Sequence, residues 1–221
     1  MVLPDAVLDL GAGDGALARP LAERVGRVDA VEISAAMVDA GRRRPGGDRP
    51  NLTWRVEPVE SMSPTGPYGL VTAGASLHWM DWPVALDRIG RVLAPGAVLA
   101  IVDQSYHELR WRSVLTDVIR PYSRSPGYDP HFSVPDELEE RGLFVIEGRR
   151  RTAPTPMPMS SRAYVEQFHS TASLARELMS PSEADRFDDE VAAVVRPYEE
   201  PDGTLVLDTV ASVVWGVPYP S

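Results

Sequence analysis

The feature that most constrains the fold is a short apolar run that ends in three closely spaced glycines. Residues 6–10 (AVLDL) precede Gly11, Gly13 and Gly15, and residues 16–25 then carry apolar side chains at helical spacing. This order is typical of a buried parallel strand joined by a tight loop to a helix. Glycines let a ligand lie close to the backbone at a helix N-terminus, which is partly positive. We therefore predict a ligand-binding strand–loop–helix unit at the start of the chain.

The alternation of strand and helix patterns continues through the first half of the chain. Ser34 is the predicted N-cap of a helix through Arg43, and a further helix is predicted over 83–93. The predicted strands are 27–33, 51–56, 68–74 and 97–102. Alternation at this spacing indicates an α/β fold with a Rossmann-like, doubly wound and mostly parallel sheet.

The pattern changes after Asp103. The aromatic and proline-rich stretch 104–134 reads as a helical lid insertion, and 155–159 reads as a Pro/Met linker. The remaining elements are predicted as helices over 134–141, 160–179 and 181–196 and strands over 143–152 and 204–217. The two late strands fit an antiparallel pair at the sheet edge, which gives seven strands with an antiparallel last strand. We expect one domain over 1–221, with a cofactor-binding core at 1–103 and substrate-lid segments at 104–134 and 153–200.

Composition excludes several kinds of chemistry. The chain has no cysteine, and its 22 lysine and arginine positions are all arginine, so thiolate metal sites, cysteine nucleophiles and Schiff-base lysines are excluded. We predict no metal site. The net charge of −10 disfavours nucleic acids and anionic membranes as partners. Because no signal peptide or membrane-spanning run is present, we expect a cytoplasmic location.

An acidic residue accompanies the glycine loop. Glu32 ends the second predicted strand, where a carboxylate can accept hydrogen bonds from both hydroxyls of a ribose. Gly11, Gly13 and Ala16 also fit a dinucleotide fingerprint, so a nicotinamide cofactor is an alternative. Asp9 opposes that alternative because its charge would repel a pyrophosphate. The same carboxylate suits S-adenosylmethionine (SAM), which carries a sulfonium and an amino group and no phosphate.

Four segments together resemble class I SAM-dependent methyltransferases, in the branch that includes trans-aconitate-type enzymes. Residues 7–15 resemble motif I, and 31–34 with Met37 resemble the ribose-binding segment. Residues 68–81 are similar to motif IV, and 89–100 are similar to the turn that follows its helix. The resemblance is strong over about residues 5–103. It implies SAM as cofactor and S-adenosylhomocysteine as product.

The resemblance also implies residue roles. Asp9 would meet the methionine amino group, and Glu32 would hold the ribose. Pro58 stands where the family carries an acidic reader of adenine, so that role would pass to the Val59 N–H and Glu60. The complete set of implied cofactor residues is Asp9, Gly11, Ala12, Gly13, Glu32, Ile33, Met37, Val59, Glu60, Gly74 and Ala75. Relatives carry covering helices before the first strand, and because few residues precede Ala6 we expect weaker SAM binding than in an upstream-extended chain.

The methyl-transfer chemistry is assigned to the end of the fourth strand. His78 is the candidate catalytic residue, since a hydroxyl acceptor benefits from a base and a carboxylate acceptor needs none. His107 and His131 are candidates for substrate contact, whereas His169 is expected to be a partly buried packing residue on a helix. Aromatic residues of the lid could line an acceptor pocket or pack the lid.

We predict a SAM-dependent methyltransferase that acts on an oxygen, a carboxylate or a hydroxyl, of a small molecule, as a monomer or homodimer. The alternatives are a SAM-binding protein with a non-methylating or regulatory role, and an NAD(P)-dependent oxidoreductase.

Overall fold

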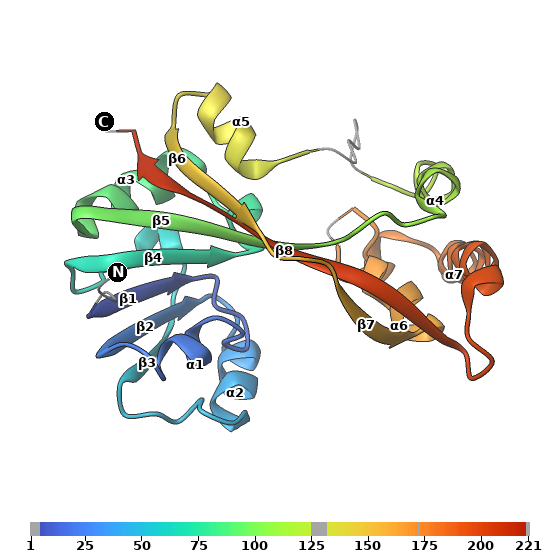
Figure 1. Cartoon of the computed structure of the whole chain (residues 1–221), viewed down its shortest axis with the longest axis horizontal. Helices are drawn as coiled ribbons and strands as arrows, with labels where there is room; N and C mark the ends of the chain where they lie inside the picture. The colour runs from blue at the N-terminus through green and yellow to red at the C-terminus, as the bar shows by residue number, and fades with distance from the viewer. Residues whose placement is uncertain (1–4, 125–131, 172, 220–221) are drawn as a thin grey trace. The chain divides into compact units, whose positions relative to one another are not determined.

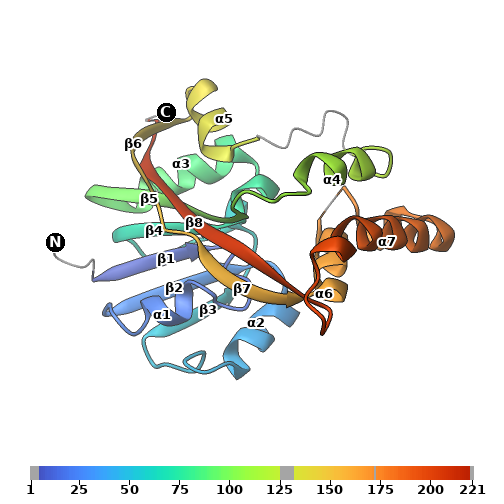
Figure 2. The same cartoon turned by 45° about the vertical axis from the view of Figure 1, so that its right-hand side comes forward.

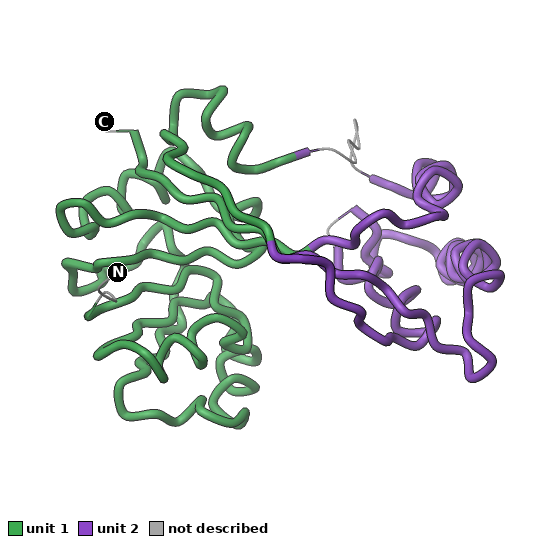
Figure 3. The backbone as a smooth tube through the Cα atoms, viewed as in Figure 1, with its two compact units in different colours: residues 1–104, 133–151, 211–221 green, residues 105–132, 152–210 purple. Residues whose placement is uncertain are grey.

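The computed structural model describes residues 5–124, 132–171 and 173–219. The chain divides into two compact units (Figure 3). Unit 1 consists of residues 1–104, 133–151 and 211–221, and unit 2 consists of residues 105–132 and 152–210. The chain therefore leaves unit 1 near the end of the fifth strand, returns for one helix and one strand, and returns again for its last residues.

Unit 1 contains the parallel sheet (Figure 1). The order of the strands is β3-β2-β1-β4-β5-β8-β6, and β7 pairs with β8 alone. The pairs β2–β3, β1–β2, β1–β4 and β4–β5 are parallel, whereas β6 is antiparallel to β8. The strands are β1 (Ala6–Leu10), β2 (Arg27–Glu32), β3 (Leu52–Val56), β4 (Tyr68–Gly74), β5 (Leu93–Tyr106), β6 (Phe144–Arg151), β7 (Thr155–Ser160) and β8 (Thr204–Pro218). The expected doubly wound α/β fold with an antiparallel last strand is confirmed, with eight strands in place of seven.

Helices cover both faces of this sheet, as Figures 1 and 2 show. Successive side chains of a strand point to opposite faces, so β1 supplies both cores. Leu8 and Leu10 belong to the core that includes α3 (Trp82–Val92) and α5 (Val134–Glu140). Val7 belongs to the core that includes α1 (Ala18–Leu21), and α2 (Ala35–Arg43) contacts β2 and β3. By the same alternation, Asp9 lies on the α1 face.

Side-chain caps fix the helix starts. The Ser34 hydroxyl accepts a hydrogen bond from Met37 N, and the Asp81 carboxylate accepts one from Val84 N at the start of α3. Ser180 and Glu183 form a capping box at the start of α7 (Pro181–Val195). These pairs satisfy backbone N–H groups that have no partner within the helix. The cap predicted at Ser34 is confirmed.

Unit 2 has a core of its own. β7 pairs antiparallel with residues 204–209 of β8. Its helices are α4 (Arg112–Ile119), α6 (Ser161–Glu166) and α7, with short 3₁₀ turns that follow α6 and α7. Tyr164 and Phe187 are fully buried between them, and Trp111 Nε1 donates a 2.9 Å hydrogen bond to the Tyr164 hydroxyl.

Three predictions of local structure were wrong. The linker expected at 155–159 is strand β7, although it contains Pro156 and Pro158. Proline lacks the N–H that a ladder bond needs, so it is tolerated only where one side of the strand is unpaired, and β7 has one partner strand. The helix expected over 16–25 is the four-residue α1, and the helix expected over 160–179 ends at Glu166 and continues as 3₁₀ turns.

Both ends of β5 also differ from the strand predicted over 97–102, since β5 begins at Leu93. β5 extends to Tyr106, so the first residues of the expected lid belong to a strand. Among the described residues, no helix combines the length and the apolar character needed to span a bilayer.

Candidate functional site

The glycine loop lies between β1 and α1. Gly11, Gly13 and Gly15 have φ values of 61°, 57° and 81°, in the left-handed region that other residues rarely adopt. Ala12 N donates to Val31 O at 3.0 Å, which ties the loop to β2. A Cβ built on Gly11 would lie 2.4 Å from Ser76 Cβ, so the glycine loop and the segment after β4 leave no room for a side chain at this position.

The carboxylate of Glu32 fixes the loop from the end of β2. Its Oε2 accepts a 2.8 Å hydrogen bond from Gly13 N, and its Oε1 accepts a 2.9 Å bond from Ser34 N. Both donors are backbone N–H groups, so the side chain holds the loop and the start of α2 in register. Each oxygen retains a second lone pair, which leaves acceptor capacity for a diol.

Asp9 is a buried carboxylate beneath the loop, with an exposed fraction of 1%. Its Oδ1 accepts a 2.7 Å hydrogen bond from Thr72 Oγ1, and its Oδ2 has no hydrogen-bond partner among the described residues. Burial raises the pKa of Asp9 to about 7, against the opposing effect of the Thr72 hydrogen bond. A buried carboxylate oxygen without a hydrogen-bond partner is a favourable site for a cationic group of a ligand, because a charged hydrogen bond there would offset the cost of burial.

Apolar side chains are exposed next to Glu32. Ile33 is 70% exposed and Met37 is 42% exposed, and Met37 Cε is the atom nearest to a Cβ built on Gly13. Such exposure next to Glu32 fits a flat aromatic base that would cover the two side chains. Val59 is buried in the core, and Glu60 Oε1 accepts a 2.9 Å bond from Asp81 N.

The end of β4 supplies the remaining predicted residues. Ala75 has a φ of 48°, an uncommon value for a residue with a Cβ, and it directly follows Gly74. His78 lies in the 3₁₀ turn Leu77–Trp79, with its ring 4.9 Å from the Trp79 ring. Partial removal from water lowers the pKa of His78, and the negative charge of Asp103 opposes this effect. The imidazole is therefore biased toward its neutral form, as a base requires.

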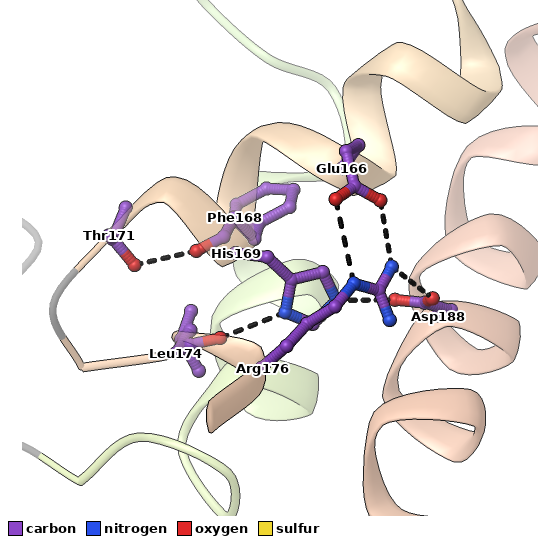
Figure 4. Close-up of polar contacts among 7 residues, drawn as sticks. All are labelled: Glu166, Phe168, His169, Thr171, Leu174, Arg176 and Asp188. Atoms are coloured by element: carbon purple, nitrogen blue, oxygen red, sulfur yellow. Dashed lines mark hydrogen bonds and ion pairs between the residues drawn. The ribbon is translucent and has the colours of Figure 1, made fainter. Parts of the chain in front are cut away.

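His107 and His169 belong to unit 2. Figure 4 shows His169 held between two acceptors, with Nδ1 2.9 Å from Leu174 O and Nε2 2.7 Å from Asp188 Oδ1. Arg176 bridges Glu166 and Asp188 in the same cluster. His169 is an interior residue, as expected. His131, the second candidate for substrate contact, lies outside the described residues, and so does Tyr128, one of the aromatic residues of the expected lid.

His107 and the lid aromatics have structural partners. His107 N donates to Asp208 O at 2.7 Å, and its ring lies 3.6 Å from the Glu108 carboxylate. Tyr106 donates a 2.6 Å hydrogen bond to Gln167 Oε1 and packs with Trp111 around the core of unit 2.

A surface hollow of about 620 Å³ lies elsewhere in unit 1, between α3 and the segment before β4. None of the predicted site residues lines it. Two of its cations already have partners, since Arg88 donates to Met62 O and Arg91 pairs with Asp87. We therefore assign no ligand to this hollow.

Comparison with known proteins now decides the family. The sequence profile of a methyltransferase domain matches residues 7–96. A malonyl-[acyl-carrier protein] O-methyltransferase from Halorhodospira halophila is 30% identical over 233 residues, a match that covers 98% of this chain and 76% of that protein. This chain belongs to the class I family of SAM-dependent methyltransferases. Membership confirms the resemblance and sets aside the nicotinamide-dependent alternative.

Other relatives agree over a shorter range. A malonyl-[acyl-carrier protein] O-methyltransferase 1 from Ilyobacter polytropus is 31% identical over 110 residues, which is 47% of this methyltransferase and 41% of that protein. The chain thus spans less than half the length of several curated relatives that it matches. A protein from Anaeromyxobacter dehalogenans described as a type II methyltransferase has the same fold, with a TM-score of 0.61 at 19% identity over 98% of this chain and 91% of its own.

Two residues of this site were not anticipated from the sequence. Thr72 holds Asp9, and Ser76 donates a 2.6 Å hydrogen bond to Leu10 O. Both come from β4 and the turn after it, and both act on β1. Their signal was two hydroxyl residues four positions apart in an otherwise apolar segment, because a buried hydroxyl needs a hydrogen-bond partner.

Proposed function

We propose that this methyltransferase transfers the SAM methyl group to an oxygen of a small molecule, most simply a carboxylate. The observation that carries the proposal is the arrangement around the glycine loop. Glu32 accepts hydrogen bonds from the backbone N–H groups of Gly13 in the loop and of Ser34 before α2, and Asp9 offers one unpaired, buried carboxylate oxygen. The first group fits a ribose and the second fits the ammonium of a methionine. Relatives named for O-methyl transfer support oxygen as the accepting atom.

The cofactor-binding roles follow the same geometry. The backbone of Gly11, Ala12 and Gly13 would line the methionine and ribose. Ile33 and Met37 would cover adenine with their exposed surfaces. Adenine would also be read by the Val59 backbone and by the Glu60 oxygen that is not bonded to Asp81, and Gly74 and Ala75 would border the methyl group.

The chemistry needs few groups from the protein. Bound SAM supplies an electrophilic methyl group on a positively charged sulfur. The chain has to orient the acceptor in line and exclude water. A carboxylate acceptor is already ionised, whereas a hydroxyl acceptor would pass its proton to neutral His78.

A binding experiment tests the cofactor assignment. S-adenosylhomocysteine should bind in calorimetry, and Glu32→Ala should weaken it by roughly a hundredfold, because hydrogen bonds to a charged acceptor are lost. Asp39→Ala, which removes an exposed carboxylate of α2, should leave the affinity unchanged. Equal affinity of wild type and Glu32→Ala would contradict the assignment.

A transfer experiment tests the reaction. The chain is incubated with methyl-labelled SAM and a panel of free carboxylic acids, carrier-bound acyl carboxylates and phenols, and labelled products are separated by their stability to mild base. Base-labile methyl esters support a carboxylate acceptor, and base-stable ethers support a hydroxyl. Binding without any transfer to this panel or to a metabolite extract would favour the regulatory, non-methylating alternative.

Several predictions about the cellular setting stay predictions. They are a cytoplasmic location, the absence of nucleic-acid and membrane partners, and a monomeric or homodimeric state. The assignment of 104–134 and 153–200 as substrate-lid segments has the same standing.

A further inference from the structure

A buried hydroxyl and a buried carboxylate face each other across two central strands of unit 1. Asp9 and Thr72 are direct partners in the parallel register of β1 and β4. Thr72 is 5% exposed, and its hydroxyl donates to Asp9 Oδ1 at 2.7 Å. A threonine hydroxyl that is buried in a sheet core needs a hydrogen-bond acceptor, and Asp9 provides it. The Thr72–Asp9 pair is therefore part of the structure of the site.

The second oxygen of the same carboxylate lacks a partner. Oδ2 is buried and accepts no hydrogen bond from the described residues. Among the residues that the structure describes, the groups that act on Asp9 include no cation. β4 contributes the Thr72 hydroxyl, α1 contributes the Ala18 backbone N–H, and β2 contributes the Glu32 carboxylate, which has the same charge as Asp9. The arginine of α1, Arg19, donates instead to Asp14 O and Pro45 O.

Such a carboxylate has two ways to relieve its burial: it can bind a proton or it can bind a cation. Burial, and to a smaller extent the charge of Glu32, raise the pKa of Asp9 to about 7, so that near neutral pH a proton occupies a large share of the molecules. The Thr72 hydrogen bond and, to a smaller extent, the Ala18 backbone N–H act in the opposite direction, because both stabilise the ionised form.

We propose that Thr72 is a positioning residue for Asp9: its hydroxyl occupies Oδ1, keeps Oδ2 for the cofactor ammonium, and favours loss of the proton that the ammonium replaces. This inference rests on the proposed cofactor site. Binding then releases the Asp9 proton to solvent, and the ammonium takes over the charge compensation. The proton competes with the cofactor, so affinity falls as the pH decreases below about 7.

The sign of the Thr72 effect follows from this competition. Thr72→Val has nearly the same shape and lacks the hydroxyl, so the pKa of Asp9 rises further. At pH 6, where Asp9 is protonated in both proteins, the variant should bind S-adenosylhomocysteine about tenfold more weakly, the equivalent of one charged hydrogen bond. As the pH rises and Asp9 ionises in both proteins, the ratio of the two Kd values should fall toward one. Titration of the ligand amine cancels in this ratio.

The experiment is calorimetric titration of the full chain with S-adenosylhomocysteine between pH 6 and 8.5, for wild type, Thr72→Val and Thr72→Ser. Thr72→Ser keeps the hydroxyl and should follow the wild-type pH profile. A residue that only supports packing would weaken binding by the same factor at every pH, and that result overturns the inference. Failure of the wild type to bind at any pH would refute the proposed cofactor site instead.

A second measurement needs no variant. Titrations of the wild type in buffers of different ionisation enthalpy count the protons released on binding. We expect nearly one proton at pH 6 and about half a proton at pH 7, where the ligand amine stays protonated. Release of no proton at pH 6, with binding intact, overturns the inference even if Thr72→Val does not fold.

Discussion

Alanine substitution of two loop glycines should separate backbone strain from steric contact. Gly11 and Gly13 have nearly equal φ values, 61° and 57°. An alanine at either position therefore has the same left-handed strain, about 1–2 kcal/mol. The spaces around the two new methyl groups differ. At Gly13 the atom nearest to the new methyl group is Met37 Cε at 3.6 Å, an ordinary van der Waals contact. At Gly11 the nearest atom is Ser76 Cβ at 2.4 Å, a distance too short for two carbons that are not bonded to each other.

The expected magnitudes follow from these distances. Gly13→Ala should lower the free energy of unfolding by about 1–2 kcal/mol, the strain alone. Gly11→Ala should lower it by a further ~1–3 kcal/mol, the usual range for overpacking in a core. Both variants change the unfolded chain in the same way, so that contribution cancels in the difference.

A double-mutant cycle with Ser76→Gly tests the cause. The substitution removes Ser76 Cβ and Oγ, the two nearest atoms, and leaves Met80 Cε at an acceptable 3.5 Å. Gly11→Ala should therefore cost ~1–3 kcal/mol less in the Ser76→Gly background, while the cost of Gly13→Ala should not change. The assay is urea unfolding followed by tryptophan fluorescence. Equal destabilisation by the two alanines, or a cost of Gly11→Ala that ignores Ser76, would refute the steric reasoning.

Three other predictions concern separate parts of the chain. If the acceptor is a hydroxyl, His78→Gln should lower kcat. Asp103→Asn should move the acidic limb of the pH–rate profile to lower pH, because the charge of Asp103 raises the pKa of His78 in the wild type. A limb that does not move would argue against His78 as the base. Tyr68→Phe removes a buried 2.5 Å hydrogen bond to Asp29 and should cost about 1–3 kcal/mol of stability in urea unfolding, with a cost near zero contradicting the bond. His169→Phe removes the hydrogen bonds of both ring nitrogens, to Leu174 O and to Asp188, and should raise hydrogen exchange in α7 while exchange in β1 stays constant. An equal change in both elements would count against a local role.

The glycine loop and the carboxylate that holds it could be predicted from the sequence because their signals are local. The glycine loop, the N-cap Ser34 and Glu32 each follow directly from the end of a strand, and period and turn chemistry locate strand ends well. The bonds from Thr72 and Ser76 could not be predicted in the same way. They join residues 63 and 66 positions apart, and only the register of β1 on β4 brings them together.

The incorrectly predicted segments have a similar physical cause. β7 has a sequence that a propensity rule assigns to a linker, and only its position beside β8 with one free edge makes two prolines acceptable. The short α1 follows a loop of three left-handed glycines, which delays the first helical turn beyond the start of the apolar pattern. In both cases the tertiary setting outweighs local preference.

The structure changes the reason for favouring SAM over a dinucleotide. From the sequence, Asp9 was expected to repel a pyrophosphate by its charge. With a pKa of about 7, however, Asp9 is largely protonated in mildly acidic solution, and a protonated carboxyl can donate a hydrogen bond to a phosphate. Charge repulsion by Asp9 alone therefore discriminates only above neutral pH. Glu32 does not add to this discrimination, because an acidic residue at this strand end suits the ribose of either cofactor. Below neutral pH, discrimination would therefore rest on the methionine ammonium, which can replace the Asp9 proton as the partner of the buried carboxylate, whereas a pyrophosphate carries no such cation.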